Sequence, residues 1–118
     1  MEEDFETDAK EYEKIVNSYK YKEVKKSLKA QLKNNNVAEE VFKDLVEDYM
    51  RLYITKELLA KNIKDTGVSI AYRNRNGYTT QKTNPSVSDF NRVNLQMIKL
   101  LDKLKLEPVL EEDEDDEL

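Results

Sequence analysis

Apolar residues recur at helical spacing over three stretches of the chain, and a short run of alternating residues separates the second stretch from the third. In residues 8–33 the apolar positions change phase near Asn17-Ser18, which predicts a break or kink in the helix there. The two stripes are Tyr12, Val16 and Tyr19, then Tyr21, Val24, Leu28 and Leu32. Asp8 and Glu11 form a possible capping box at the start. Asn34-Asn35-Asn36 predicts the end, since asparagine tolerates the left-handed conformation.

The other two stretches predict long helices. One runs from about Val37 to Asp65 and is ended by Gly67; at 1.5 Å per residue it is roughly 40 Å long. Its apolar positions are Val41, Phe42, Leu45, Tyr49, Leu52, Tyr53, Leu59 and Ile63. The other runs from about Ser86 to Leu106, after the turn and first-turn proline of Asn84-Pro85. Its main stripe is Phe90, Val93, Met97, Leu101 and Leu104, which Leu95, Ile98 and Leu100 widen.

Asn76-Gly77 lies between two strand-like runs, which is a strong local signal of a β-hairpin. A two-residue turn there would pair Arg75 with Tyr78, Arg73 with Thr80 and Ala71 with Lys82. One face would then carry Arg73, Arg75, Tyr78 and Lys82, and the other Val68, Ile70 and Tyr72. We expect the apolar face to pack on the helices and the basic face to point outward. A four-residue turn starting at Asn74 is the alternative, and it would change this register.

Together these elements predict a mainly α fold with one β-hairpin, in the order helix or helices, long helix, hairpin, helix. A chain of 118 residues is expected to form one domain. We divide it into an acidic flexible N-terminus (1–7), a basic helical segment (8–36), an oligomerisation core (37–108) and a disordered acidic tail (109–118). Such an extended protomer buries limited surface, so we expect self-association. The predicted contact residues are Leu52, Leu59, Ile63, Ile70, Tyr72, Phe90, Val93, Met97, Leu101 and Leu104.

Composition limits the available chemistry. The chain has no histidine and no cysteine, which removes the commonest general base and every thiolate metal site. It also has no P-loop and no pair of nucleophile and base. We therefore expect no catalytic residue, no cofactor and no small-molecule substrate; a magnesium site made only of carboxylates is the one metal site left open. No apolar run approaches the roughly 20 residues of a membrane span, and the acidic start is unlike a signal peptide. A soluble intracellular protein is expected.

The net charge of −5 is unevenly distributed. Residues 1–16 carry −5, residues 17–110 carry +7 and residues 111–118 carry −7. A basic body between acidic ends indicates either an anionic partner or a merely solubilising surface. Lysines spaced by four, three and four residues from Lys22 to Lys33 line one helix face, which could neutralise several phosphates. The candidate DNA-binding residues are Lys20, Lys22, Lys25, Lys26, Lys29, Lys33, Arg73, Arg75 and Lys82. A solvated helix face and a charged edge strand are the alternatives.

The segment GVSIAYRNRNGYTTQKTNPSVSDFNRVNLQMIKLLDKLKL, with the preceding helix LVEDYMRLYITKELLAKNI, resembles the small subunit of tailed-phage terminases. The likeness is a helix ending near a glycine, a short hairpin, an Asn-Pro helix start and a Leu-Gly-Leu-like end, here Leu104-Lys105-Leu106 without the glycine. It spans roughly Leu45 to Pro108. It implies a non-enzymatic adaptor that binds double-stranded viral DNA at the packaging start, recruits or regulates the large ATPase and nuclease subunit, and forms a ring of about eight to ten chains.

The resemblance has further implications. It places the protein in the cytoplasm of the infected bacterial host and outside the mature virion. Many members carry a helix-turn-helix, for which only Ala30 to Asp48 would fit, and its acidic second helix is a poor surface for a major groove. The family's C-terminal part contacts the large subunit or portal. This implies a docking role for Glu111, Glu112, Asp113, Glu114, Asp115, Asp116 and Glu117. The alternative function is a helical protein–protein adaptor without a DNA role, or a regulator that mimics DNA.

Overall fold

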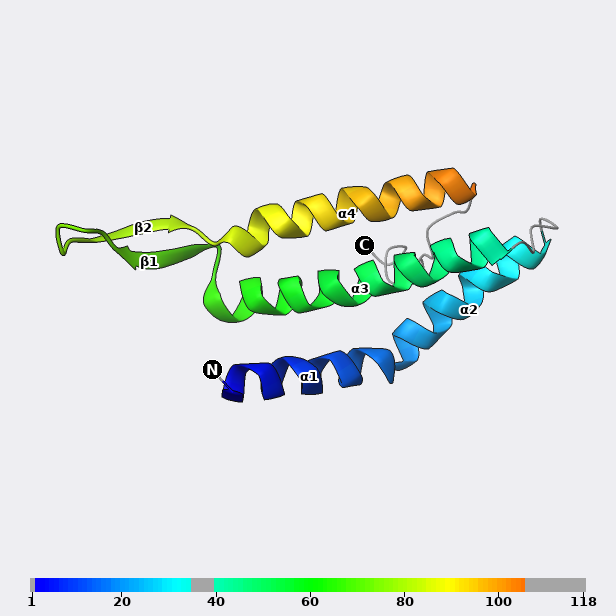
Figure 1. Ribbon diagram of the computed structural model, residues 1–118, viewed down its shortest axis with the longest axis horizontal. Coiled ribbons are helices and arrows are strands. Elements are labelled where there is room, and N and C mark those ends of the chain that lie inside the picture. The colour runs from blue at the N-terminus through cyan, green and yellow to red at the C-terminus, as the bar shows by residue number, and fades with distance from the viewer. Residues whose placement is uncertain (1, 35–39, 106–118) are drawn as a thin grey trace, which may run out of the picture.

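The computed structural model describes residues 2–34 and 40–105, which form helices and one antiparallel hairpin (Figure 1). The elements are α1 (Glu2–Val16), α2 (Tyr19–Asn34), α3 (Glu40–Thr66), β1 (Ser69–Arg73), β2 (Thr79–Thr83) and α4 (Pro85–Leu104). The predicted mainly helical fold with a hairpin between two long helices is therefore confirmed. Helix α3 lies between α4 on one side and α1 with α2 on the other, and the hairpin projects beyond the ends of α3 and α4. The molecule is elongated, measuring 61 × 35 × 28 Å.

The predicted break at Asn17-Ser18 is confirmed, because α1 ends at Val16 and α2 begins at Tyr19. The Ser18 hydroxyl donates to the carbonyl of Ile15 at 2.7 Å and accepts from the amide of Tyr21 at 3.1 Å. Ser18 therefore satisfies backbone groups of both helices where the chain changes direction. The capping box at Asp8 is wrong, since α1 already begins at Glu2 and Asp8 lies within it. Acidic residues along the first turn favour this earlier start through the helix dipole.

Helix α3 is described from Glu40 to Thr66, so only its predicted end can be compared with the structure. Its predicted start at Val37 lies outside the described residues, as do Asn35 and Asn36. Its end agrees with the prediction, because the helix stops at Thr66 and Gly67 follows with a φ of +102°. The amide of Gly67 donates to the carbonyl of Ile63 at 2.7 Å. A glycine is favoured there because a side chain would be strained at that φ.

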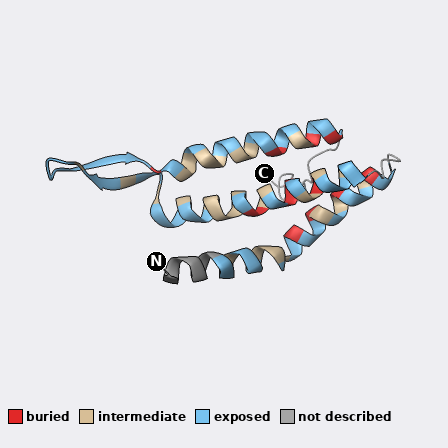
Figure 2. Ribbon diagram, in the orientation of Figure 1, coloured by how far each residue is buried: buried red, intermediate tan, exposed pale blue. Residues whose placement is uncertain are grey.

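The core gathers at the end of the bundle away from the hairpin (Figure 2). It combines the second stripe predicted for α2 with residues of α3 and α4. The buried residues are Tyr21, Val24, Leu28, Leu32, Val46, Tyr49, Met50, Ile54, Met97, Leu101 and Leu104. Three of them, Val46, Met50 and Ile54, are absent from the apolar stripe predicted for α3. They form a second stripe at a spacing of four residues, which α3 needs because helices pack on both of its sides.

Asn84 joins the base of the hairpin to both long helices. It is 4% exposed and is the N-cap of α4: its side-chain oxygen accepts from the amide of Ser86 at 3.0 Å. Its side-chain amide donates to the side-chain oxygen of Asn62 and to the carbonyl of Gly67, each at 2.9 Å. The predicted helix start at Asn84-Pro85 is confirmed. At the other end α4 stops at Leu104, and Lys105 adopts the left-handed conformation at φ 58°.

The hairpin has the alternative register. Arg73 pairs with Thr79 and Ile70 with Lys82, so the two-residue turn and its pairings are wrong. The amide of Gly77 donates to the carbonyl of Asn74 at 3.0 Å, as in a four-residue turn starting at Asn74. The Asn74 side chain stabilises this turn by accepting from the amides of Asn76 and Tyr78 at 2.9 and 3.1 Å. Gly77 supplies the positive φ of +85° that the turn requires.

The change of register also overturns the predicted faces. Lys82 lies opposite Ile70 and its ammonium sits 4.7 Å from the centre of the Tyr72 ring, so Lys82 shares a face with the apolar residues instead of with Arg73. The predicted packing of that face on the helices is wrong too. Val68 and Tyr72 are 59% and 43% exposed, and the hairpin extends away from the bundle.

Candidate nucleic-acid interface

Helix α2 is the most basic of the described helices, with six lysines and a single acid, Glu23. Tyr21, Val24, Leu28 and Leu32 are buried in the core, which leaves one lysine-rich side in solvent. We call Lys22, Lys26, Lys29 and Lys33 the lysine stripe, and all four are exposed. They span roughly 16 Å at 1.5 Å per residue. That length is enough to contact several phosphates of one DNA strand.

One acid of α3 limits this surface. The carboxylate of Glu47 lies 3.2 Å from the ammonium of Lys25 and 3.8 Å from that of Lys29. Lys22, Lys26 and Lys33 have no ion-pair partner among residues 9–34 and 40–105, so these three are the most available for phosphate. Lys20 lies on another side of α2, where it lines a cavity of about 270 Å³ together with Lys56 and Glu57.

If the lysine stripe binds DNA, replacing Glu47 by glutamine should tighten that binding by roughly 2- to 5-fold at low salt. The change removes one negative charge and releases Lys25 and Lys29, and each new phosphate contact should steepen the salt dependence by about 0.9. Fluorescence anisotropy of labelled duplex DNA would measure both. Asp48→Asn is the matched control, because Asp48 has the same charge but pairs with Arg51 at 2.8 Å. Equal effects of the two variants would remove any special role of Glu47.

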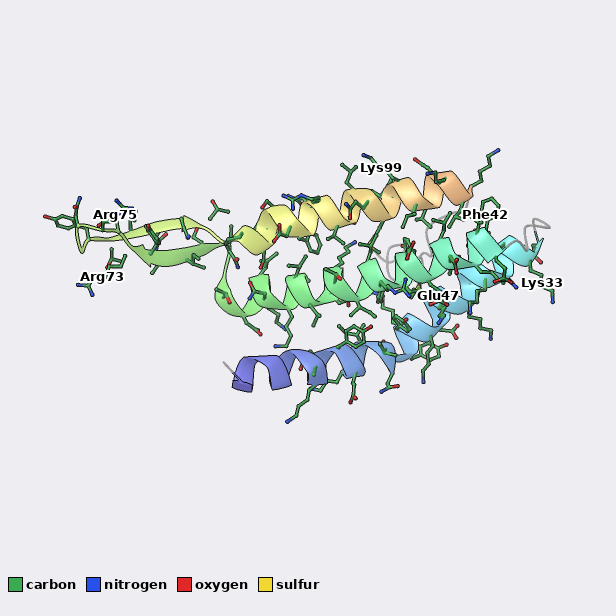
Figure 3. The ribbon with its side chains drawn as sticks, viewed as in Figure 1. Lys33, Phe42, Glu47, Arg73, Arg75 and Lys99 are labelled. Atoms are coloured by element: carbon green, nitrogen blue, oxygen red, sulfur yellow. The ribbon has the colours of Figure 1, made fainter. Side chains whose placement is uncertain are left out.

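The hairpin arginines lie far from the lysine stripe (Figure 3). Arg73 and Arg75 are at the outer end of the hairpin, whereas Lys33 is near the opposite end of the molecule. The Nε of Arg73 donates to the carbonyl of Gly77 at 3.3 Å, which holds its guanidinium beside the turn. One protomer therefore presents two separate basic surfaces, and the predicted DNA-binding residues do not form a single site.

A basic groove between α3 and α4 was missed by the sequence analysis. It has a volume of about 590 Å³ and is lined by Asp48, Arg51, Leu52, Gln96, Lys99, Leu100 and Lys103. Lys99 and Lys103 are four residues apart on α4, a spacing that could have indicated a second basic helix face. The prediction for α4 used only its apolar stripe, which lies on the opposite side of the helix. The groove shares no residue with the lysine stripe.

The predicted oligomerisation residues divide into three groups by burial. Met97, Leu101 and Leu104 are buried in the protomer core. The half-buried residues are Leu52, Leu59, Ile63, Ile70, Phe90 and Val93. Tyr72 is exposed, as are Leu95 and Ile98 at 52% and 48%. Only the last two groups have surface left for a second chain. The predicted docking residues 111–117 lie outside the described residues.

Three described side chains, Tyr49, Lys61 and Asp65, have pKa values shifted by their surroundings. Burial raises the pKa of the Tyr49 hydroxyl. The hydrogen bond of 2.6 Å between Lys61 and Asp65 raises the pKa of Lys61 and lowers the pKa of Asp65. These shifts move the pKa values further from 7. Within the described part of the chain, no group of three or more acidic residues is placed to hold a metal ion. None of the described helices has the length and apolar character needed to cross a membrane.

Comparison with known proteins gives one match. A family model described as "Phage terminase, small subunit" matches residues 22–113, most of the chain. No curated protein and no solved structure matches. The matched region begins within α2 and includes the lysine stripe, α3, the hairpin and α4.

Proposed function

The chain belongs to the phage terminase small-subunit family, and from this premise we propose that it binds double-stranded viral DNA as a non-catalytic packaging adaptor. Membership supports a role in phage DNA packaging, which takes place in the cytoplasm of the host. In the proposal, the adaptor marks the packaging start and recruits or regulates the large subunit. That partner supplies the ATPase and nuclease chemistry.

The observation that carries the DNA-binding proposal is the lysine stripe. Four exposed lysines follow one side of α2, and Glu23 is the only acid in that helix. Such a stripe neutralises phosphates without reading sequence, and it releases counterions when DNA binds. Electrophoretic mobility shift with duplex DNA at two salt concentrations tests the proposal. We expect binding that weakens steeply as salt rises. No binding even at low salt would favour the helical protein–protein adaptor instead.

We further propose that the protein acts as a ring of identical chains. Apolar side chains remain exposed on the hairpin and on α4, notably Val68, Tyr72, Leu95 and Ile98, and a neighbouring chain could cover them. A long, thin protomer also has little core for its surface. Light scattering should give a mass of about eight to ten chains, the ring size that the resemblance to the family implies. A well-folded protein that stays monomeric at micromolar concentration would contradict this prediction.

The acidic tail is proposed to restrain DNA binding and to help dock the large subunit. Residues 111–117 are all acidic, so they can compete with phosphate for lysines. Individual pairs are weak and are screened beyond roughly 10 Å at 0.1 M salt, but the tether gives the tail a high effective concentration. Truncation after Val109 should therefore tighten nonspecific DNA binding at low salt, with a smaller gain at high salt. It should also weaken stimulation of the large subunit's ATPase.

A full-length variant with the seven acids changed to their amides is the control for the tail. It separates the effect of charge from the effect of chain length, since it keeps all 118 positions and removes only the negative charges. We expect it to reproduce the tighter DNA binding of the truncated chain. If neither variant changes DNA affinity or ATPase stimulation, the tail has no role in either process.

A further inference from the structure

The corrected register gives the hairpin two chemically different faces. One face carries Ile70, Tyr72, Thr80 and Lys82. The other, which we call the polar face, carries Ser69, Ala71, Arg73, Thr79, Gln81 and Thr83. All six residues of the polar face are exposed. Apart from Ala71, each has a side chain that can form hydrogen bonds, and none is acidic. Indeed no acid occurs anywhere between residues 66 and 88.

The shape of the hairpin suits a DNA groove. Two strands lie about 4.7–4.9 Å apart, and the major groove of B-DNA, about 12 Å wide, admits a two-stranded ribbon. The hairpin projects past the ends of α3 and α4, so the bundle does not block its approach to a duplex (Figure 1). Its exposure on both faces also distinguishes it from a hairpin that completes a core. A protruding, acid-free ribbon with one polar face has the shape and charge that recognition of nucleic acid requires.

We propose that the polar face lies in the major groove and reads base edges, with Arg73 contacting guanine and Gln81 contacting adenine. The inference rests on the proposed DNA-binding function and deepens it, because it names the element that provides sequence preference. Arginine donates two parallel hydrogen bonds to guanine, and glutamine pairs in the same bidentate way with adenine. The bond from Arg73 to Gly77 uses only its Nε, which leaves the outer nitrogens of the guanidinium for a base.

The register sets the spacing of these two contacts. Arg73 is opposite Thr79, so Gln81 is its diagonal neighbour on the same face. Diagonal neighbours are roughly 7–8 Å apart, which corresponds to about two base-pair steps of 3.4 Å. Thr79, directly opposite Arg73 and two residues before Gln81 on β2, can contact a thymine methyl group or a base edge. The turn at residues 75–77 contains only arginine, asparagine and glycine, so it has no apolar wedge of the kind that kinks DNA from the minor groove.

The two basic surfaces then have different tasks. The lysine stripe binds phosphates on any sequence, and the polar face of the hairpin selects among sequences. Because these surfaces are at opposite ends of the protomer, a change in one can be measured without disturbing the other. Sequence preference can therefore be tested separately from DNA binding itself.

The test is selection of duplexes from a randomised pool by the full-length protein, followed by affinity measurements on the selected duplex and a scrambled one. Wild type should enrich a motif. Arg73→Lys keeps the charge but loses the bidentate fork, so the affinity ratio of selected to scrambled duplex should fall roughly 10-fold or more. Gln81→Ala should lower the ratio similarly, at another base position. Neither variant should change the scrambled affinity more than about twofold. Thr80→Ala, exposed on the opposite face, is the control and should leave the ratio unchanged.

The outcomes separate this inference from the proposed function. No binding to any duplex overturns both. Binding without an enriched motif, or a motif that Arg73→Lys and Gln81→Ala leave intact, overturns base reading by the hairpin and leaves DNA binding standing. Equal loss of affinity for both duplexes would assign the hairpin to phosphate contact, which also overturns base reading. A loss confined to the selected duplex, with the Thr80 variant unaffected, supports it.

Discussion

Replacing Leu101 by aspartate should unfold the chain itself, and not merely separate one chain from another. Leu101 is 5% exposed in the core that α4 shares with α2 and α3. Removing a buried leucine side chain costs about 2–5 kcal/mol, and a carboxylate without a partner in an apolar site adds several more. A domain of this size is stable by only about 5–15 kcal/mol in total. We therefore expect loss of the cooperative thermal transition, measured by circular dichroism.

Leu95→Asp is the matched control for this prediction, because it makes the same chemical change on the same helix at a residue that is 52% exposed. It should leave the protomer folded, with a melting temperature within a few degrees of wild type. If Leu95 lies at a contact between chains, light scattering should show a smaller assembly of folded protein. A folded Leu101→Asp protein with a wild-type melting curve would show that the core described for α4 is wrong.

The order of the elements could be predicted because each boundary depends on residues close to it in sequence. Asn84 caps α4 with its own side chain, and Gly67 ends α3 through its own backbone conformation. The phase change at Asn17-Ser18 is likewise local. Such features need no knowledge of distant parts of the chain, so the periodicity of apolar residues and a few capping residues were sufficient.

The burial of α3 could not be predicted in the same way. Its periodicity indicates an amphipathic helix, but Val46, Met50 and Ile54 lie outside the stripe that was identified. They are buried because α3 is packed between helices on two sides. The apolar pattern of one helix does not show how many other helices pack against it. The same limit applies to Met97 and Leu101, whose apolar character predicted a contact but not whether the partner was the same chain or another.

The hairpin shows how one side chain can alter a candidate site. Asn76-Gly77 favours a two-residue turn, yet Asn74 accepts two backbone hydrogen bonds and the turn starts there. A shift of one residue exchanges the faces of a strand. It moved Lys82 onto the Tyr72 ring and left Arg73 beside Thr79 and Gln81. The sequence therefore indicated which residue types could bind DNA, whereas the structure was needed to see which of them share a face.

Reversing two charges of the lysine stripe should have the largest effect on DNA binding. In the double variant Lys22→Glu, Lys26→Glu, two exposed ammonium groups without ion-pair partners among the described residues become carboxylates. Two lost phosphate contacts should reduce the slope of log affinity against log salt by about 1.8. Repulsion from the new carboxylates adds to the loss, so affinity should fall roughly 10- to 100-fold near 0.1 M salt for every duplex tested.

The control for this variant is Lys99→Glu, Lys103→Glu, which changes the net charge equally and also alters lysines four residues apart on one helix. These lysines line the groove between α3 and α4, and α4 lies across α3 from α2 (Figure 1). Beyond roughly 10 Å, charges are largely screened at 0.1 M salt, so the control should lose little affinity if α2 contacts the phosphates. Equal losses would mean that binding follows net charge alone. A larger loss in the control would move the DNA contact to the groove, and the assignment of α2 would then be wrong.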